Sequence, residues 1–95
     1  MTADPNDGDE LVAIQALGHI ASDDELLSRF MSMTGVEPGD FRRLAGERSF
    51  LVAVLDFLGN HEPDLIGFAE ALGQSPERVM EARHRLAGPD HAGYE

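Results

Sequence analysis

A chain of 95 residues with a net charge of −11 and no cysteine is long enough for one domain with a modest core. The lack of cysteine excludes disulfides, thiolate zinc sites and cysteine nucleophiles, and the acidity disfavours nucleic acid and anionic membranes as partners. The opening stretch MTADPNDGDE does not have the basic residue and apolar run of a signal peptide, and no stretch approaches roughly 20 apolar residues, so we expect a cytoplasmic protein without a membrane span.

Helical periodicity dominates the chain and predicts an all-α fold, a compact bundle of about six short helices. One domain is expected over residues 9–87, between a flexible acidic tail at residues 1–8 and a flexible tail at residues 88–95. The first helix should run from about residue 9 to residue 21. Its inward face is predicted to consist of Leu11, Ile14, Leu17 and Ile20.

A second helix is predicted to begin after a cap at Ser22 or Asp23 and to end at Gly35. Its buried stripe is predicted to consist of Leu26, Leu27, Phe30, Met31 and Thr34. Pro38 should then begin a short third helix that passes through Phe41 and Leu44, because proline is tolerated in a first helical turn.

The fourth segment, FLVAVLDFLGN at residues 50–60, is apolar almost all round, which is typical of a helix packed on most sides. Ser49 is predicted to cap it, and we expect it to be the central helix. Asp56 is its one acid and should meet either an arginine or solvent. The arginines nearest in sequence are Arg42, Arg43 and Arg48.

The last two helices are predicted to begin at Pro63 and at Ser75-Pro76, with Gly73 ending the first of them and the second running to about Ala87. The inward face of the fifth helix is predicted to consist of Leu65, Ile66, Phe68, Ala69 and Leu72.

A shift of 38 residues aligns the two halves of the chain without gaps. The identical pairs are Leu17 with Leu55, Leu27 with Leu65, Phe30 with Phe68, Gly35 with Gly73 and Pro38 with Pro76. These pairs fall on predicted core positions, on the glycines that end helices and on the prolines that begin them. Two interpretations stay open: two copies of one three-helix unit, or similar hairpins that use leucine, glycine and proline for the same local reasons.

The segment LGQSPERVMEARHRLAG raises the alternative of a DNA-binding helix-turn-helix built from residues 64–73 and 76–87. Ala69, Gly73 and Val79 have the spacing of such a turn. The side chains that could meet DNA are Arg78, Arg83, His84 and Arg85. Against this reading, Glu77 and Glu81 lie among the arginines, and Glu81 is placed to pair with Arg85 four residues on.

Catalytic and metal-binding patterns are weak in this sequence. Its four histidines show no metal-ligand pair at helical spacing, and no nucleophile or phosphate-loop motif occurs, so we expect no metal, no cofactor and no enzymatic activity. An enzyme would need a cleft lined by Asp56, His61 or Glu62.

The function favoured by the sequence is therefore non-enzymatic interaction with another protein or with itself. Phe30, Met31 and Met33 combine adaptable apolar groups with an acidic rim, as a partner groove requires. Three arginines complete the predicted interaction surface: Arg42, Arg43 and Arg48.

The stretch RRLAGERSFLVAVLDFLGNHEPDLIGFAEALGQSPERVMEARHRL, residues 42–86, with the preceding LLSRFMSMTG, resembles a family of short bacterial all-helical proteins known only as a domain of unknown function. The resemblance implies a bacterial helical domain. It carries over no activity, cofactor or site residue.

Overall fold

The helical fold expected from the sequence is confirmed by the structure, a computed structural model that describes residues 7–88. That part of the chain contains no strand. Its helices are α1 (Asp7–Ala21), α2 (Asp24–Thr34), the 3-10 helix η1 (Pro38–Asp40), α3 (Phe41–Leu44), α4 (Arg48–Gly59), α5 (Glu62–Leu72) and α6 (Pro76–Ala87). The tails predicted at the two ends lie mostly outside the described residues, although Asp7 and Gly8 belong to α1.

Side-chain caps and left-handed glycines set several helix ends. The Asp23 carboxylate accepts hydrogen bonds from the backbone N–H groups of Glu25 and Leu26, both at 3.0 Å, and so caps α2. Gly35 and Gly73 end α2 and α5 with φ of +73° and +79°, a conformation that costs glycine little. These helix ends agree with the sequence pattern.

The predicted cap of α4 was wrong. This helix begins at Arg48, two residues earlier than expected, and the extended residue Glu47 precedes it. The backbone N–H of Leu51 donates to the carbonyl of Glu47 at 3.1 Å, so the first turn closes on Glu47 and leaves Ser49 inside the helix. Likewise α5 begins at Glu62, just before Pro63.

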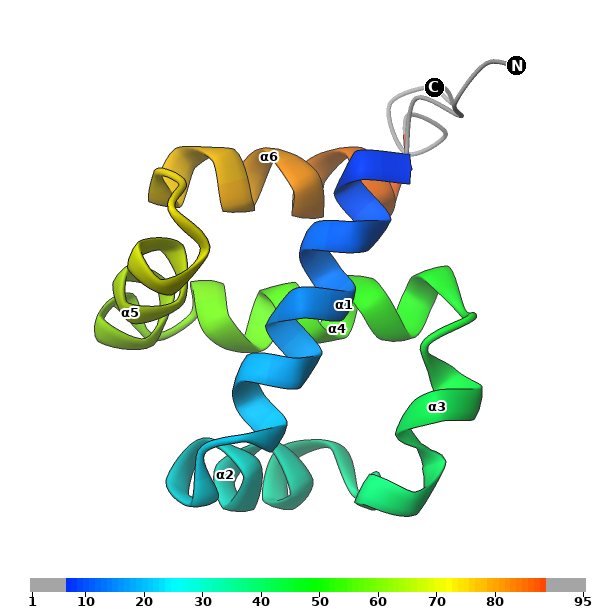
Figure 1. Ribbon diagram of the computed structural model, residues 1–95. Helices are drawn as coiled ribbons and strands as arrows, with labels where there is room; N and C mark the ends of the chain where they lie inside the picture. The colour runs from blue at the N-terminus through cyan, green and yellow to red at the C-terminus, as the bar shows by residue number, and fades with distance from the viewer. Residues whose placement is uncertain (1–6, 89–95) are drawn as a thin grey trace.

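The core forms where α1 crosses α4 near the middle of the molecule, with α6 packed on both (Figure 1). Phe30 of α2 is completely buried at one end of this core. Its ring makes edge contacts with Phe41, Phe50 and Phe57, at centroid distances of 5.8, 6.0 and 5.3 Å. The prediction that α4 is the central helix is confirmed by its six buried side chains: Phe50, Leu51, Val54, Leu55, Phe57 and Leu58.

The predicted inward face of α1 was half wrong. Leu17 and Ile20 are buried, but Leu11 and Ile14 are 55% and 44% exposed. The buried face is Val12, Ala13, Ala16, Leu17 and Ile20. Both faces have helical spacing, and the one that carries small alanines allows the closer approach of α1 to the bulky α4.

Smaller differences affect α2 and α5. Thr34 is exposed instead of buried, because it lies in the last turn of α2, where its hydroxyl donates to the Phe30 carbonyl. Ile66 is also exposed, while Leu27, Met31 and Leu72 are half-buried at the edges of the core.

The 38-residue repeat extends to the three-dimensional structure. The bounds of α2, shifted by 38 residues, coincide with those of α5, and Pro38 and Pro76 each occupy a first helical turn. The five buried apolar positions of α1, shifted by 38, fall on Phe50, Leu51, Val54, Leu55 and Leu58, which are all buried in α4. In Figure 1, α2 and α3 extend from α1 much as α5 and α6 extend from α4. The two halves therefore repeat one structural unit, in which α6 is the longer equivalent of α3.

Candidate interaction surfaces

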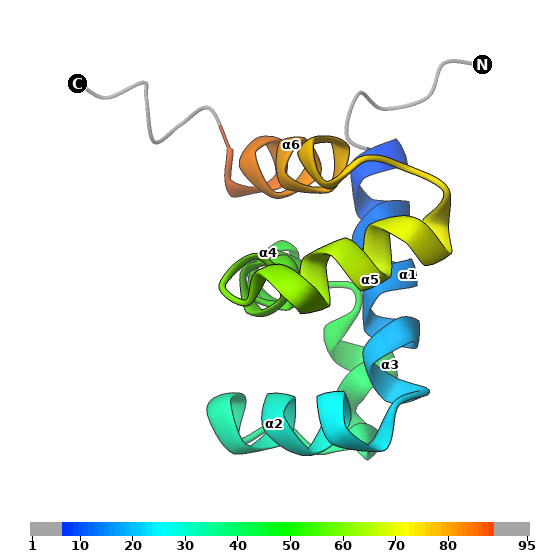
Figure 2. The ribbon, with the colours of Figure 1, turned by 90° about the vertical axis from the view of Figure 1, so that its left-hand side faces the viewer.

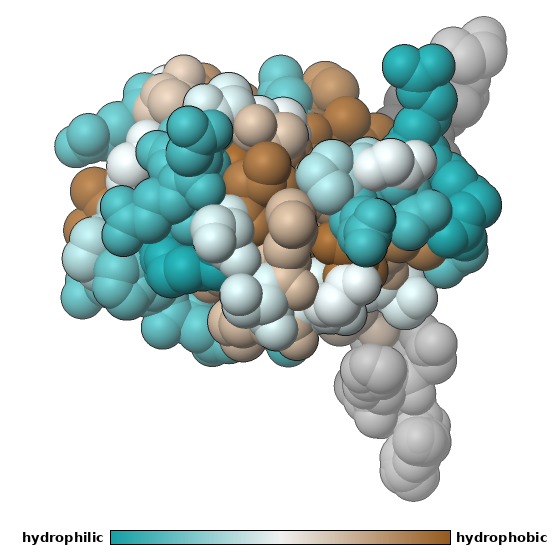
Figure 3. Space-filling view, turned by 90° about the horizontal axis from the view of Figure 1, so that it is seen from below, coloured by the Kyte–Doolittle hydropathy of each residue, from teal (hydrophilic) through white to brown (hydrophobic). Residues whose placement is uncertain are grey.

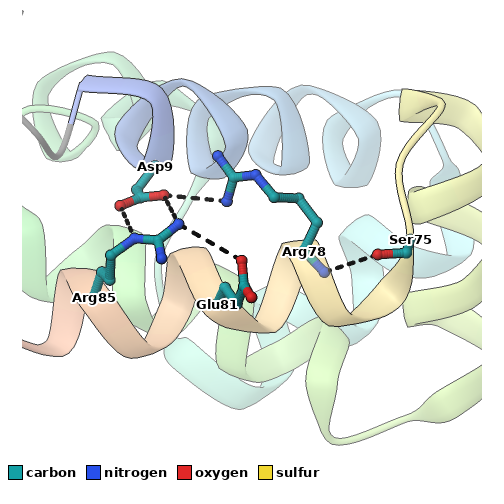
Figure 4. A network of polar contacts seen from close by, with 5 residues as sticks. All are labelled: Asp9, Ser75, Arg78, Glu81 and Arg85. Atoms are coloured by element: carbon teal, nitrogen blue, oxygen red, sulfur yellow. Dashed lines mark hydrogen bonds and ion pairs between the residues drawn. The ribbon is translucent and has the colours of Figure 1, made fainter.

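The arginines of α6 are turned toward neighbouring helices. Arg85 donates from Nε and Nη2 to the two carboxylate oxygens of Asp9, at 2.8 and 3.1 Å, and Nη1 of Arg78 donates to the same carboxylate at 3.1 Å. Figure 4 shows Asp9 of α1 held between the two guanidinium groups. The Asp9 side chain is only 2% exposed. Two arginines proposed for DNA binding thus fix the first turn of α1.

The charge of Asp9 depends on these two arginines. Burial raises the pKa of Asp9, but the hydrogen bonds and positive charges of Arg85 and Arg78 outweigh burial and leave its pKa below the ordinary value. The hydrogen bond to Asp9 raises the pKa of Arg85 in turn. Asp9 is therefore a buried, ionised carboxylate, a feature that sequence periodicity did not reveal.

The third arginine of α6 binds the acid of the central helix. Nε of Arg83 donates to the Asp56 carboxylate at 2.6 Å, and this hydrogen bond raises the pKa of Arg83. The expectation that Asp56 meets an arginine is confirmed, but the partner is not one of Arg42, Arg43 and Arg48. The reason is that α6 packs along α4, whereas those three residues lie at or before its first turn.

The local features predicted for a helix-turn-helix are present. Ala69 and Val79 are buried, and Gly73 makes the left-handed turn between them. The predicted pair of Glu81 with Arg85 also occurs, at 3.8 Å. However, each arginine of α6 contacts a carboxylate of another helix. Among the predicted DNA-contacting side chains, only exposed His84 has no such contact within residues 7–88. The arginines of α6 therefore have a structural role, because their ion pairs hold α6 against α1 and α4.

The residues predicted to form an interaction surface on α2, α3 and the start of α4 differ in their exposure to solvent. Phe30 has no exposed surface, so its place in the predicted buried stripe of α2 is confirmed and its assignment to a contact surface was wrong. Met31 is half-buried and Met33 is 68% exposed. The arginines Arg42, Arg43 and Arg48 are all exposed. Seen from the side where α2 lies, a band of apolar surface runs between hydrophilic regions (Figure 3).

A shallow depression lies between the first turn of α4 and the last turn of α6, with a volume of about 510 Å³. It is lined by Arg48, Ser49, Val52, Arg83, Leu86 and Ala87. None of Asp56, His61 and Glu62, any of which was expected to line the cleft of an enzyme, lines this depression. Asp64 instead joins His61 at 2.9 Å and Arg29 of α2 at 2.8 Å, which ties α2 to α5.

Within residues 7–88, no three histidine, aspartate or glutamate side chains are grouped closely enough to hold a metal ion. The helices of the same region are also too short or too polar to cross a membrane.

The least expected surface is the solvent side of α1. We define the outer face of α1 as the exposed residues Leu11, Ile14, Gln15, Gly18 and Ala21. This helix crosses in front of α4 in Figure 1 and lies toward the right in Figure 2, so the two views agree that its outer face points away from the bundle. No charged Asp, Glu, Lys or Arg occurs between Glu10 and Asp23. The 38-residue repeat could have predicted this exposed face. The buried positions of α4, shifted by 38 residues, fall on the opposite, buried face of α1.

A family model described as a protein of unknown function (DUF3572) matches residues 6–89. The match is wider than the stretch on which the resemblance rested. No curated protein and no solved structure matches the chain.

Proposed function

The chain belongs to the DUF3572 family, whose description assigns no activity, and we propose from the geometry that it is a non-enzymatic protein-interaction module that binds through the outer face of α1. A cytoplasmic location, suggested by the lack of cysteine, is part of this proposal. The bacterial origin implied by the resemblance belongs to it as well.

The observation that carries the proposal is the exposure of Leu11 and Ile14 on an uncharged helix face of a highly charged chain. Bulky apolar side chains on the exposed side of a helix gain free energy when another surface covers them. The bundle covers only the side of α1 that carries Ala13 and Ala16. Covering the exposed parts of Leu11 and Ile14 would contribute about 1 kcal/mol for each side chain.

The distribution of charged side chains also favours the outer face of α1 as the binding surface. The arginines of α2 and α6 are occupied by ion pairs with Asp9, Asp56 and Asp64 inside the described chain. Interface centres are poor in charged residues and rich in apolar ones. The outer face of α1 has that composition, whereas Met33 on α2 stands beside Ser32 and the paired Arg29.

Site-specific photocrosslinking tests the proposal. A photoreactive residue at Gln15 should give discrete covalent adducts in cells that express the protein. The same residue at Arg42 is the matched control, since Arg42 is exposed on α3, in the surface that the sequence had favoured. Adducts from Arg42 and none from Gln15 would contradict the proposed surface.

A further inference from the structure

We propose that the outer face of α1 binds a second copy of this chain, with the two α1 helices antiparallel across a two-fold axis near Ile14 and Gln15. This inference rests on the proposed function and names its partner. Three features of the face carry it: the order of bulky and small residues, an exposed glycine, and the absence of charge.

Bulky and small residues occupy opposite halves of the face. Leu11 and Ile14 lie toward the start of α1, and Gly18 and Ala21 lie toward its end. An antiparallel two-fold arrangement would place Leu11 of each copy against Gly18 of the other. The large leucine side chain would then fill the space that glycine leaves open. A two-fold interface has to be self-complementary in this way, because the same patch forms both sides.

The fold does not require Gly18. Its φ is not positive, and a Cβ built on it would meet no atom within 4 Å. A glycine inside a helix is less favourable than alanine, because its backbone loses more conformational freedom. Close approach of a helix from outside the described chain gives this glycine a role, since small residues allow helix axes to come near each other.

Charge limits where a second copy could bind. Two chains of net charge −11 repel each other, so contact between them is least unfavourable where carboxylates are absent. The outer face of α1 is such a place. A basic partner would instead be drawn to the start of α2, where Asp23, Asp24 and Glu25 are all exposed.

The size of the face indicates a weak dimer. The 15 residues of α1 span roughly 22 Å at a rise of about 1.5 Å per residue, and a helix with side chains is only about 10 Å wide. One such face is smaller than the roughly 800 Å² per partner of a standard interface. We therefore expect a reversible dimer at concentrations of roughly tens to hundreds of micromolar.

Sedimentation equilibrium of the full chain at low and high salt tests the dimer. The expected result is a monomer–dimer equilibrium that strengthens with salt, because salt screens the repulsion. Gly18→Gln should weaken the dimer at least tenfold. Gly67→Gln is the matched control, since Gly67 is also an exposed helix glycine with open space around its Cβ position, and it should leave the dimer unchanged. A dimer weakened by Gly67→Gln and unaffected by Gly18→Gln would overturn the proposal.

Disulfide formation tests the antiparallel order, because the chain has no cysteine of its own. An oxidised mixture of Leu11→Cys and Gly18→Cys chains should form mixed disulfides, and each variant alone should form far fewer. Self-linking of each variant alone would contradict the antiparallel packing. A chain that stays monomeric at millimolar concentration, yet crosslinks from Gln15 to a different protein, would overturn the second-copy inference and leave the proposed function intact.

Discussion

Asp9 and Arg85 are 76 positions apart in the sequence and are joined by hydrogen bonds of 2.8 and 3.1 Å. This contact holds the first turn of α1 against the end of α6, and Arg78 adds a third hydrogen bond to the same carboxylate. The burial is unequal: the Asp9 side chain is almost fully covered, whereas those of Arg78 and Arg85 are 29% and 47% exposed. Removing the arginines should therefore cost more than removing the acid.

The double variant Arg78→Ala/Arg85→Ala should lose about 2–4 kcal/mol of unfolding free energy, because it leaves a buried carboxylate without a cation. Asp9→Asn added to that variant should restore part of the loss, since the charge itself is then removed. Urea denaturation of the wild type, the double variant and the triple variant measures this. A triple variant that is less stable than the double variant would contradict a charge-based role.

The pKa of Asp9 determines its pH dependence. Because its pKa in the folded state is lowered, its contribution to stability is fully present above the ordinary value of about 3.9 and is lost as pH falls through the folded pKa. The difference in melting temperature between the wild type and Asp9→Asn should therefore be constant near neutral pH and shrink below about pH 4. A difference that grows on acidification would contradict the ion pairs.

Two glycines of the α5 region should respond oppositely to alanine. Gly73→Ala should destabilise the protein by about 1 kcal/mol or more, because φ at this position is +79°. Gly67→Ala should stabilise it by up to about 1 kcal/mol, because Gly67 lies inside α5 with no atom near its Cβ position. Thermal melts of both variants measure the contrast, and equal effects would contradict the turn geometry.

Substitutions at Phe30 and Met33 of α2 should differ in their effect on stability, because Phe30 lies in the core and Met33 on the surface. Phe30→Ala should cost about 3–5 kcal/mol, since it opens a cavity among three phenylalanine rings. Phe30→Leu should show a smaller loss in a protein that still folds. Met33→Gln, at an exposed position, should change stability by less than about 0.5 kcal/mol. Comparable losses for Phe30→Leu and Met33→Gln would contradict this assignment.

Local signals account for what could be predicted of the fold. Asp23, Ser75, Gly35 and Gly73 act on backbone groups within a few residues, so their sequence pattern is sufficient to place helix ends. The inward face of α1 was not determined locally, because apolar residues occur on both sides of the helix. Only the neighbour that α1 packs against decides which side is buried.

The candidate surface was missed for the same reason. Leu11 and Ile14 were assigned to the core by their spacing. The spacing of Phe30 placed it correctly in the buried stripe of α2, but Phe30 was also assigned to the contact surface together with its neighbours Met31 and Met33. The arginines of α6 looked available because their partners, Asp9 and Asp56, lie 27 or more positions away. Contacts at such separations depend on the tertiary arrangement, which periodicity does not specify.

The chain contains only three isoleucines, and they provide the most direct measurement of the proposed surface. Ile14 lies on the outer face of α1, Ile66 is exposed on α5 and Ile20 is buried in the core. In methyl NMR spectra of isoleucine-labelled protein recorded from about 10 µM to about 1 mM, the range expected for a weak interface, the Ile14 signal should shift while those of Ile66 and Ile20 stay fixed. Binding through another surface, seen as a shift at Ile66 with none at Ile14, would contradict the account.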